Sequence, residues 1–240
     1  MFFGKELWYN QKKSRKSKRY MKADPSSKEN TGNRRLILET AKRLYYERGM
    51  EDVSFDEIAD ICGVTKSLIR YHFGSKAKLA NELFGTYSKE QANVFFRKAY
   101  ALGGSYSNID ILDAYSILCL RYYCADEKAL RFYTQLFSCS FTDISYGIED
   151  FYKVGGRQPQ RDDPDYHHMI YIGSQYAARG LIYHYATGEI KCDEKTFAKY
   201  YIGLGKAHIQ DEAERERSLD RAYEILERVS ISFEPCFVWA

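Results

Sequence analysis

The spacing of apolar positions predicts a helical chain from about Asn33 onward. The first helix carries an apolar stripe made of Leu36, Ile37, Thr40, Ala41, Leu44 and Tyr45. Charged side chains fill the opposite face, as expected of a helix that packs on one side only. Gly49 is expected to end this helix, because glycine readily adopts the left-handed backbone found after the last helical turn.

Two short helices follow, separated by a glycine. Ser54 opens the first of them, and Glu57 stands three residues later, which is the S-x-x-E pattern of a capping box. The apolar stripe of this helix is Phe55, Ile58, Ala59 and Cys62. Gly63 breaks the pattern. A second short helix is then predicted over residues 65–73.

The rest of the chain is also predicted to be helical. Apolar and charged positions keep a helical period, and no alternating run competes with it as a strand. The expected helices lie at residues 75–101, 109–125, 127–139, 143–153, 164–187, 194–209 and 211–231. The fold class is therefore all-α, with an N-terminal three-helix domain that contains a helix-turn-helix and a larger helical domain after it.

Composition narrows the class of protein further. A chain of 240 residues is long enough for one or two domains with a sizeable core. No apolar run reaches the roughly 18 residues that span a bilayer, and the N-terminus lacks the apolar segment of a secretory signal. We therefore expect a cytoplasmic protein with no membrane association and with reduced cysteines. The histidines lack the one-turn spacing of helical metal ligands, so neither a metal nor a cofactor is expected.

The net charge is distributed unevenly. The whole chain carries +3, but residues 1–22 hold eight lysines and arginines against Glu6, so they carry +7 and the remainder carries −4. We expect residues 1–32 to form a basic tail. It is a disordered arm, an arm that follows a DNA groove, or a segment upstream of a true start at Met21. We favour disorder or the later start, because charge runs are usually solvated.

The two short helices describe a helix-turn-helix. In that motif the second helix lies in the DNA major groove, which is about 12 Å wide. The residues that can pack inward are Val64, Leu68, Ile69 and Phe73. Those left for the outer face are Thr65, Lys66, Ser67, Arg70 and Tyr71. Arg70 suits a bidentate contact with guanine, whereas Lys66 and Lys76 suit phosphates.

The stretch from Arg34 to Phe84 resembles the DNA-binding domain of the TetR family of bacterial transcriptional regulators. The matching pieces keep their order and spacing: Ile37-Leu38, Ala41, Gly49, Ser54, Ile58-Ala59, Gly63-Val64, Lys66, Tyr71-His72-Phe73, Ser75-Lys76 and Leu79. Such an extended match is more specific than an isolated helix-turn-helix.

Three positions depart from the family's pattern. Cys62 stands where the family commonly has Ala, Ser67-Leu68 where it often has Gly-Thr, and Arg70 where an aromatic residue is frequent. The first difference is neutral. The Arg70 difference changes which bases or phosphates are within reach, so the operator sequence of a relative does not carry over to this chain.

Residues 33–84 are accordingly expected to form the DNA-binding domain, and residues 85–240 a helical regulatory and dimerisation domain, as the resemblance implies. The residues assigned to contact with a double-stranded DNA operator are Arg34, Ser54, Thr65, Lys66, Ser67, Arg70, Tyr71, His72 and Lys76.

The second domain is unusually rich in aromatic residues, which suits a mostly apolar pocket with a few polar contacts. The residues assigned to a pocket for an unknown small-molecule effector are Tyr115, Tyr122, Tyr133, Phe137, Phe141, Tyr152 and Tyr176. For any single one of them, a place in the ordinary core is the more common role of an aromatic residue.

A homodimer is expected for a geometric reason as well as by resemblance. Two recognition helices must sit one DNA turn apart, about 34–36 Å, to bind a palindrome. In relatives, the helix pair that corresponds to residues 164–187 and 194–209 meets its twofold mate as a four-helix bundle. Residues 211–231 add an amphipathic helix, whose partner is either the core or the dimer mate.

The leading hypothesis is a transcriptional repressor that binds a palindromic operator as a dimer and is released by a small molecule. The alternative is a DNA-binding regulator controlled by a protein partner. An enzyme is not expected, because the sequence contains no nucleotide-binding GxGxxG after a strand, no Walker A motif, no GxSxG and no HExxH. The effector, the operator and the direction of regulation are not encoded in any motif that we find.

Overall fold

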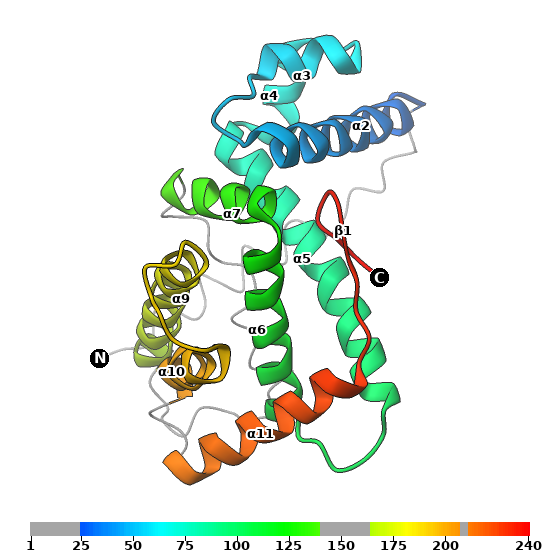
Figure 1. Ribbon diagram of the computed structural model, residues 1–240. Helices are drawn as coiled ribbons and strands as arrows, with labels where there is room; N and C mark the ends of the chain where they lie inside the picture. Colours follow the sequence, from blue (N-terminus) through cyan, green and yellow to red (C-terminus); the bar gives the residue numbers. More distant parts are fainter. Residues whose placement is uncertain (1–24, 140–163, 207–210) are drawn as a thin grey trace, which may run out of the picture.

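The computed structural model describes residues 25–139, 164–206 and 211–240 (Figure 1). In chain order its elements are α2 (Pro25–Arg48), α3 (Phe55–Cys62), α4 (Lys66–Phe73), α5 (Lys76–Ala101), α6 (Asn108–Ala125), α7 (Glu127–Cys139), α9 (Pro164–Ala186), α10 (Glu194–Lys206), α11 (Glu212–Arg228), β1 (Phe233–Glu234) and β2 (Val238–Trp239). The all-α fold class is confirmed.

The first helix begins earlier than its apolar stripe predicts. Helix α2 starts at Pro25, whereas its apolar spacing predicts a start near Asn33. Proline is favoured in the first turn of a helix, where its fixed φ is helical and its missing N–H has no intrahelical partner to lose. Residues 25–32 lack the apolar spacing on which the prediction relied. Residues 1–24 lie outside the described ranges.

Local capping fixes the ends of the short helices. Gly49 has φ +87° just after α2 ends, and Gly63 has φ +65° just after α3, so both glycines act as predicted. Ser54 accepts a hydrogen bond from the Glu57 amide at 3.1 Å. The Glu57 side chain, which the capping box would direct to the Ser54 amide, instead accepts a bond from Arg48. Half of the predicted box is therefore present at this helix.

The three N-terminal helices share a small core. Ile37, Ala41 and Tyr45 of α2 are fully buried, together with Ile58 of α3 and Ile69 of α4. Leu36, predicted for the same stripe, remains 46% exposed. It lies at the edge of the stripe, where neighbouring side chains cover less of it. Burial of these apolar side chains drives the domain together, at about 25 cal/mol per Å² removed from water.

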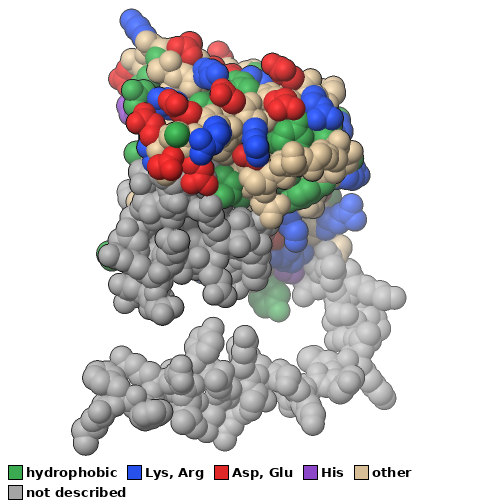
Figure 2. All heavy atoms as spheres, turned by 90° about the horizontal axis from the view of Figure 1, so that it is seen from below, with side chains coloured by type: hydrophobic (Ala, Val, Ile, Leu, Met, Phe, Trp, Pro, Cys, Tyr) green, Lys and Arg blue, Asp and Glu red, His purple; other side chains and the backbone are tan. Residues whose placement is uncertain are grey.

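The long helix α5 leads from this domain into a body built around α6. Helices α5, α7, α9, α10 and α11 all pack against α6. In Figure 1 the helices α3 and α4 lie at one end of the molecule and α11 at the other. Seen from the α11 end, acidic and basic side chains are interspersed (Figure 2). Helices α10 and α11 are joined by the ion pairs Lys195–Asp220 and Lys199–Glu216.

The predicted helices of the body correspond closely to those described, with ends that shift by a few residues. The helix predicted for residues 143–153 falls outside the described ranges. Helix α11 ends at Arg228, three residues before its predicted end, because the chain turns into an extended segment. In the described parts of the chain, no helix is both long and apolar enough to cross a membrane.

A small antiparallel hairpin at the C-terminus corrects the expectation of no strands. Phe233 pairs with Trp239 and Glu234 with Val238. Each strand is only two residues long, too short to produce a recognisable alternation in the sequence. The hairpin packs along α5, which places the end of the chain against the core of the body (Figure 1).

Candidate nucleic-acid interface

The turn between α3 and α4 is fixed by backbone and side-chain hydrogen bonds. The Val64 amide donates to the Ala59 carbonyl at 3.0 Å, which closes the end of α3. Thr65 then caps α4, because its hydroxyl oxygen accepts from the Leu68 amide at 3.2 Å. The predicted helix over residues 65–73 therefore has Thr65 as its cap and Lys66 as its first residue. These bonds hold α4 at a set angle to α3, as a helix-turn-helix requires.

The two faces of α4 divide as predicted. Ile69 is fully buried and Phe73 nearly so, and both pack into the core of the N-terminal domain. Ser67, Arg70 and Tyr71 lie on the opposite face, where Tyr71 is 75% exposed. Thr65 is also exposed, whereas Val64 and Leu68 are half-buried. The outer face of α4 therefore offers hydroxyl, guanidinium and phenol groups to a partner.

The cations around α4 differ in their existing partners. Lys66 Nζ lies 2.6 Å from Asp56 Oδ2 on α3. Lys76 Nζ donates to the Glu51 carbonyl at 2.9 Å. Among the residues that the structure describes, Arg70 has no ion-pair partner, and its side chain is exposed. Arg70 is therefore the cation of α4 that can contact DNA without giving up an internal bond.

Arg34 and His72 have roles inside the protein. The Arg34 guanidinium lies 2.6 Å from Glu82 on α5 and 5.1 Å from the centre of the Phe73 ring, so it links α2, α4 and α5. His72 is half-buried, with its Nε2 atom shielded from solvent. Burial lowers the pKa of His72, and the nearby Arg34 charge lowers it further, so the neutral imidazole is favoured. Arg34 and His72 therefore help to hold α4 in its position in the N-terminal domain.

Two serine caps lie near the same surface. Ser54 caps α3, and Ser75 caps α5 by accepting from the Lys78 amide at 3.2 Å. Each hydroxyl uses its oxygen as an acceptor and keeps its own proton available for a phosphate oxygen. The N-terminal end of α5 also presents backbone N–H groups and the positive end of its helix dipole.

Four of the described residues assigned to the effector pocket belong to one extended aromatic core, namely Tyr115, Tyr122, Tyr133 and Phe137. Tyr115 and Tyr122 pack on Trp239, with ring centres 5.9 and 5.5 Å away. Tyr133 and Phe137 contact each other at 4.7 Å. Tyr176 is half-buried on α9. Two further residues of the assignment, Phe141 and Tyr152, fall outside the described ranges.

Arg179 of α9 places a charged group against this aromatic core. Its guanidinium carbon lies 3.4 Å from the centre of the Phe137 ring and 5.4 Å from that of Tyr176. A cation over an aromatic face is attracted by the negative charge of the ring. Burial raises the pKa of Tyr133 above the usual range, and the Arg179 charge opposes that rise.

A surface hollow of about 300 Å³ lies elsewhere, along the exposed side of α5. Its lining residues are Glu82, Gly85, Thr86, Lys89, Glu90 and Asn93. These side chains are polar or absent, and all of them come from one helix. None of the aromatic residues assigned to an effector lines this hollow.

Helices α9 and α10 carry exposed apolar side chains on their outer sides. Tyr185 of α9 stacks on Phe197 of α10, with ring centres 4.1 Å apart, which holds the two helices together. Tyr183, Tyr200 and Leu204 point outward, and Tyr200 is 69% exposed. An apolar face of this kind on two packed helices is typical of a protein–protein interface.

The core is completed by C-terminal residues that the sequence pattern does not predict. Phe237 and Trp239 are almost fully buried, and the Phe237 carbonyl accepts a bond from Gln91 Nε2 at 3.0 Å. The only local signal for them is a high density of aromatic residues near the end of the chain. That signal does not indicate which distant helices they contact.

Comparison with known proteins supports the N-terminal assignment. Residues 37–83 match the bacterial regulatory proteins of the tetR family. Over 50 residues, the chain is 40% identical to the HTH-type transcriptional regulator TtgR of Pseudomonas putida. It is equally similar to the probable HTH-type transcriptional regulator ArpR of the same species. The alignments cover 21% of this chain and only 24% of either relative.

Two solved structures with a similar arrangement of helices are also described as TetR-like regulators. A TetR-like transcriptional regulator from Rhodococcus sp. RHA1 has a TM-score of 0.43 at 17% identity, with 75% of this chain and 97% of that chain covered. A tetR-family transcriptional regulator from Streptomyces coelicolor has a TM-score of 0.45 at 15% identity, with 81% and 89% covered. Sequence identity is therefore higher over the short N-terminal match than over these longer structural alignments.

Proposed function

We propose that this chain, whose residues 37–83 match the tetR family of bacterial regulatory proteins, is a DNA-binding transcriptional regulator of that family. The observation that carries the proposal is the outer face of α4, where Ser67, Arg70 and Tyr71 are exposed on a helix of fixed orientation. A helix about 10–12 Å across fits the major groove of B-DNA.

On this proposal, α4 contacts base edges, and its surroundings contact phosphates. Arg70 donates to guanine O6 and N7, while Thr65, Ser67 and Tyr71 supply hydroxyl groups. Lys66 and Lys76 bind phosphates, which requires each to exchange an internal acceptor for a phosphate oxygen. Ser54 and the N-terminal end of α5 are further phosphate donors. Arg34 and His72 contribute by holding α4 in position against α2 and α5.

The assembly that we propose is a homodimer through α9 and α10. Their outward Tyr183, Tyr200 and Leu204 side chains supply an apolar face for a second copy of the chain. A twofold dimer carries two copies of α4, which can then occupy successive major grooves of a palindromic operator.

The regulation that we propose is release from the operator by a small molecule bound in the aromatic body. Tyr133, Phe137 and Tyr176 surround the Arg179 guanidinium, a combination that suits an aromatic or anionic effector. Such an effector shifts the DNA-binding equilibrium only if it binds the two arrangements of the dimer with different affinity. In this role the protein is a repressor, and it carries out no catalysis.

The experiment that tests this regulation starts from genomic DNA fragments bound by the purified protein. The bound fragments are titrated with a panel of metabolites, and release is measured at constant salt. Release by one compound class, lost in Arg179→Leu but kept in Arg217→Leu on the exposed side of α11, supports the proposal. Release only after addition of a cell extract's protein fraction supports control by a protein partner, and it contradicts a small-molecule effector.

A further inference from the structure

We propose that Phe237, at the tip of the C-terminal hairpin, is a positioning residue that sets the orientation of the DNA-binding domain on the helical body. The inference deepens the proposed function and rests on it. It concerns the contacts that hold the N-terminal domain against the helical body, which the match to residues 37–83 does not cover.

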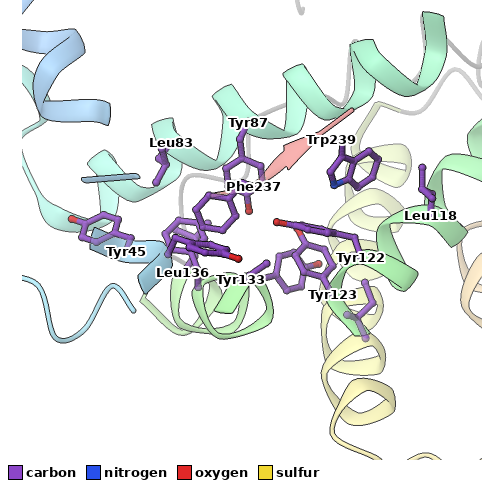
Figure 3. Packing of buried hydrophobic residues seen from close by; sticks show 14 of the residues in the cluster. Tyr45, Leu83, Tyr87, Leu118, Tyr122, Tyr123, Tyr133, Leu136, Phe237 and Trp239 are labelled. Atoms are coloured by element: carbon purple, nitrogen blue, oxygen red, sulfur yellow. The ribbon is translucent and has the colours of Figure 1, made fainter. Parts of the chain in front are cut away.

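The Phe237 ring lies where three helices meet. Its centre is 5.1 Å from that of Tyr46 on α2, with the rings nearly perpendicular. It stacks on Tyr87 of α5, with centres 4.4 Å apart and planes 7° from parallel. It also lies 5.1 Å from Phe132 of α7. One side chain, only 1% exposed, therefore contacts the DNA-binding domain and two helices that belong to the body. Figure 3 shows Phe237 beside Tyr87.

The rest of the hairpin is anchored on the body. Trp239 packs on Tyr115 and Tyr122 of α6. Lys98 Nζ of α5 donates to the Ser230 carbonyl at 2.8 Å. The base of the hairpin is thus fixed to α5 and α6, while its tip reaches α2. Because the hairpin contacts both the N-terminal domain and the helical body, a shift of the hairpin would move the end of α2.

The backbone at the tip is held in an unfavourable conformation. Cys236 has φ 61° and Phe237 has φ 63°, and both lie in the left-handed region. Residues other than glycine and asparagine rarely adopt it, because Cβ approaches the following carbonyl oxygen. A hairpin that only needed to turn would be better served by glycine. Docking of the buried ring and the Gln91 bond to the Phe237 carbonyl offset this strain.

Polar contacts join the same end of α2 to the body. Tyr46 Oη donates to Asp126 Oδ2 at 2.9 Å. Arg131 of α7 donates to the Glu47 carbonyl at 2.8 Å, near the C-terminal end of α2. These bonds connect α2 to the loop before α7 and to α7 itself, whereas Phe237 adds a rigid apolar contact shared with α5. Removal of the ring leaves α2 attached but free to change its angle.

The test compares Phe237→Ala with Val238→Ala, whose side chain is in the same hairpin but 41% exposed. Each variant is titrated with DNA selected by the wild-type protein, and with the same DNA after insertion of one base pair between its half-sites. We expect Phe237→Ala to lose at least tenfold in affinity for the selected DNA and to lose most of its preference for the original spacing. Val238→Ala should retain both.

Phe237→Leu serves where the alanine variant fails to fold, because leucine keeps an apolar side chain and loses the stacked ring. Wild-type affinity and spacing preference in a folded Phe237→Leu protein would overturn the inference. So would a loss of affinity accounted for entirely by the unfolded fraction, since a merely structural role leaves the spacing preference of the folded molecules unchanged.

A measurement without DNA separates this inference from the proposed function. Hydrogen exchange of the Gly49 and Met50 amides reports on the end of α2, and that of the Leu68 and Ile69 amides reports on α4. We expect Phe237→Leu to accelerate the first pair and to leave the second unchanged. If the wild-type protein selects no DNA, the proposed function fails; if exchange is the same in wild type and variant, the positioning role fails.

Discussion

Arg70 and Lys66 lie one turn apart on α4, but their surroundings give them different roles. Lys66 is paired with Asp56, so contact with a phosphate only replaces one acceptor by another. Arg70 is exposed and, among the described residues, unpaired by any carboxylate. Its planar guanidinium can donate two hydrogen bonds to one guanine, which is the geometry that distinguishes base pairs in the major groove.

Replacement of Arg70 by alanine should therefore relax sequence specificity. We expect a cost of about 1–3 kcal/mol in operator binding, confined to discrimination at one base position of each half-site. Lys66→Ala is the matched comparison, and it should weaken binding to all sequences alike and reduce the salt dependence. Affinities for single-base variants of a bound DNA, measured at two salt concentrations, separate the two effects. Equal behaviour of the two variants would refute the assignment of Arg70 to base contact.

Gly49 is a second residue whose identity is fixed by its surroundings. Its φ is +87°, and a Cβ built there would lie 2.7 Å from Gln135 Oε1 of α7. That oxygen accepts a hydrogen bond from the Met50 amide at 2.6 Å, so Gln135 cannot move away without loss of the bond. Glycine at this position allows α7 to approach the end of α2.

Gly49→Ala should thus lower the free energy of unfolding by about 1–3 kcal/mol, because alanine is strained at this φ. The close contact between its Cβ and Gln135 should lower the free energy of unfolding further. Gly63→Ala is the control, since Gly63 has a similar φ of +65° but open space where its Cβ would be. Chemical denaturation gives both values, and the difference between them measures the contact with Gln135. An equal loss in the two variants would show that Gln135 moves aside at little cost.

At the scale of elements, α6 and α11 are joined through buried polar groups. The Ser218 hydroxyl lies 3.0 Å from Asp110 Oδ1 and 2.7 Å from Asp113 Oδ2. Both carboxylates are almost fully buried on α6. Arg221 of α11 lies 3.4 Å from Asp110 Oδ2. Buried carboxylates are costly without donors, so the hydroxyl stabilises this helix pair.

Ser218→Ala should lower the free energy of unfolding by about 1–3 kcal/mol, because a buried carboxylate loses a donor. Ser116→Ala on α6 is the control: the Ser116 hydroxyl is bonded to the Leu112 carbonyl of its own helix, so its loss should have a small effect. Urea denaturation of both variants provides the measurement. A Ser218→Ala protein as stable as Ser116→Ala would mean that other donors already satisfy the two carboxylates.

Element positions followed from the sequence wherever a helix has an apolar period or a capping residue. Thr65 and Ser75 mark helix starts through their side chains, and the glycines at 49 and 63 mark ends through their φ values. The start of α2 did not follow, because a polar first turn has no periodicity. The C-terminal hairpin did not follow either, since its conformation depends on contacts with helices far away in the sequence.

In the candidate interface too, the sequence predicts features that depend on local pattern and not contacts between distant segments. Exposure of Ser67, Arg70 and Tyr71 was predictable, because the alternation of buried and exposed positions on α4 is local. The partners of Lys66 and Lys76 were not, since each lies on another segment of the chain. The role of Phe237 in the core required the fold, because ring contacts across three helices have no counterpart in a sequence pattern.

Net charge limits how strongly the molecule as a whole is attracted to DNA. Residues 23–240 carry a net charge of −4, and the end at α11 mixes both signs (Figure 2). A stretch of chain with this net charge adds little sequence-independent attraction to DNA. On the proposed function, the DNA affinity comes from the α3–α4 surface of each of the two copies of the chain in the dimer.

The dimer proposal predicts a large effect of one charge on α10. Tyr200→Glu places a carboxylate on the proposed interface, where burial of an unpaired charge is costly, so we expect monomers and a loss of at least tenfold in operator affinity. Tyr100→Glu is the control, on an exposed position of α5 away from that face. Sedimentation analysis gives the mass of each variant. A dimeric Tyr200→Glu protein would place the interface elsewhere.

The proposed function requires the exposed face of α4 to bind specific DNA as part of a twofold assembly. The most direct measurement selects bound sequences from a random DNA pool at physiological salt, and then compares the affinity of the selected DNA with that of unselected DNA. We expect two inverted half-sites centred about 34–36 Å apart and an affinity ratio of about 10³ or more. Absence of a shared sequence, with binding that disappears as salt is raised, would contradict it.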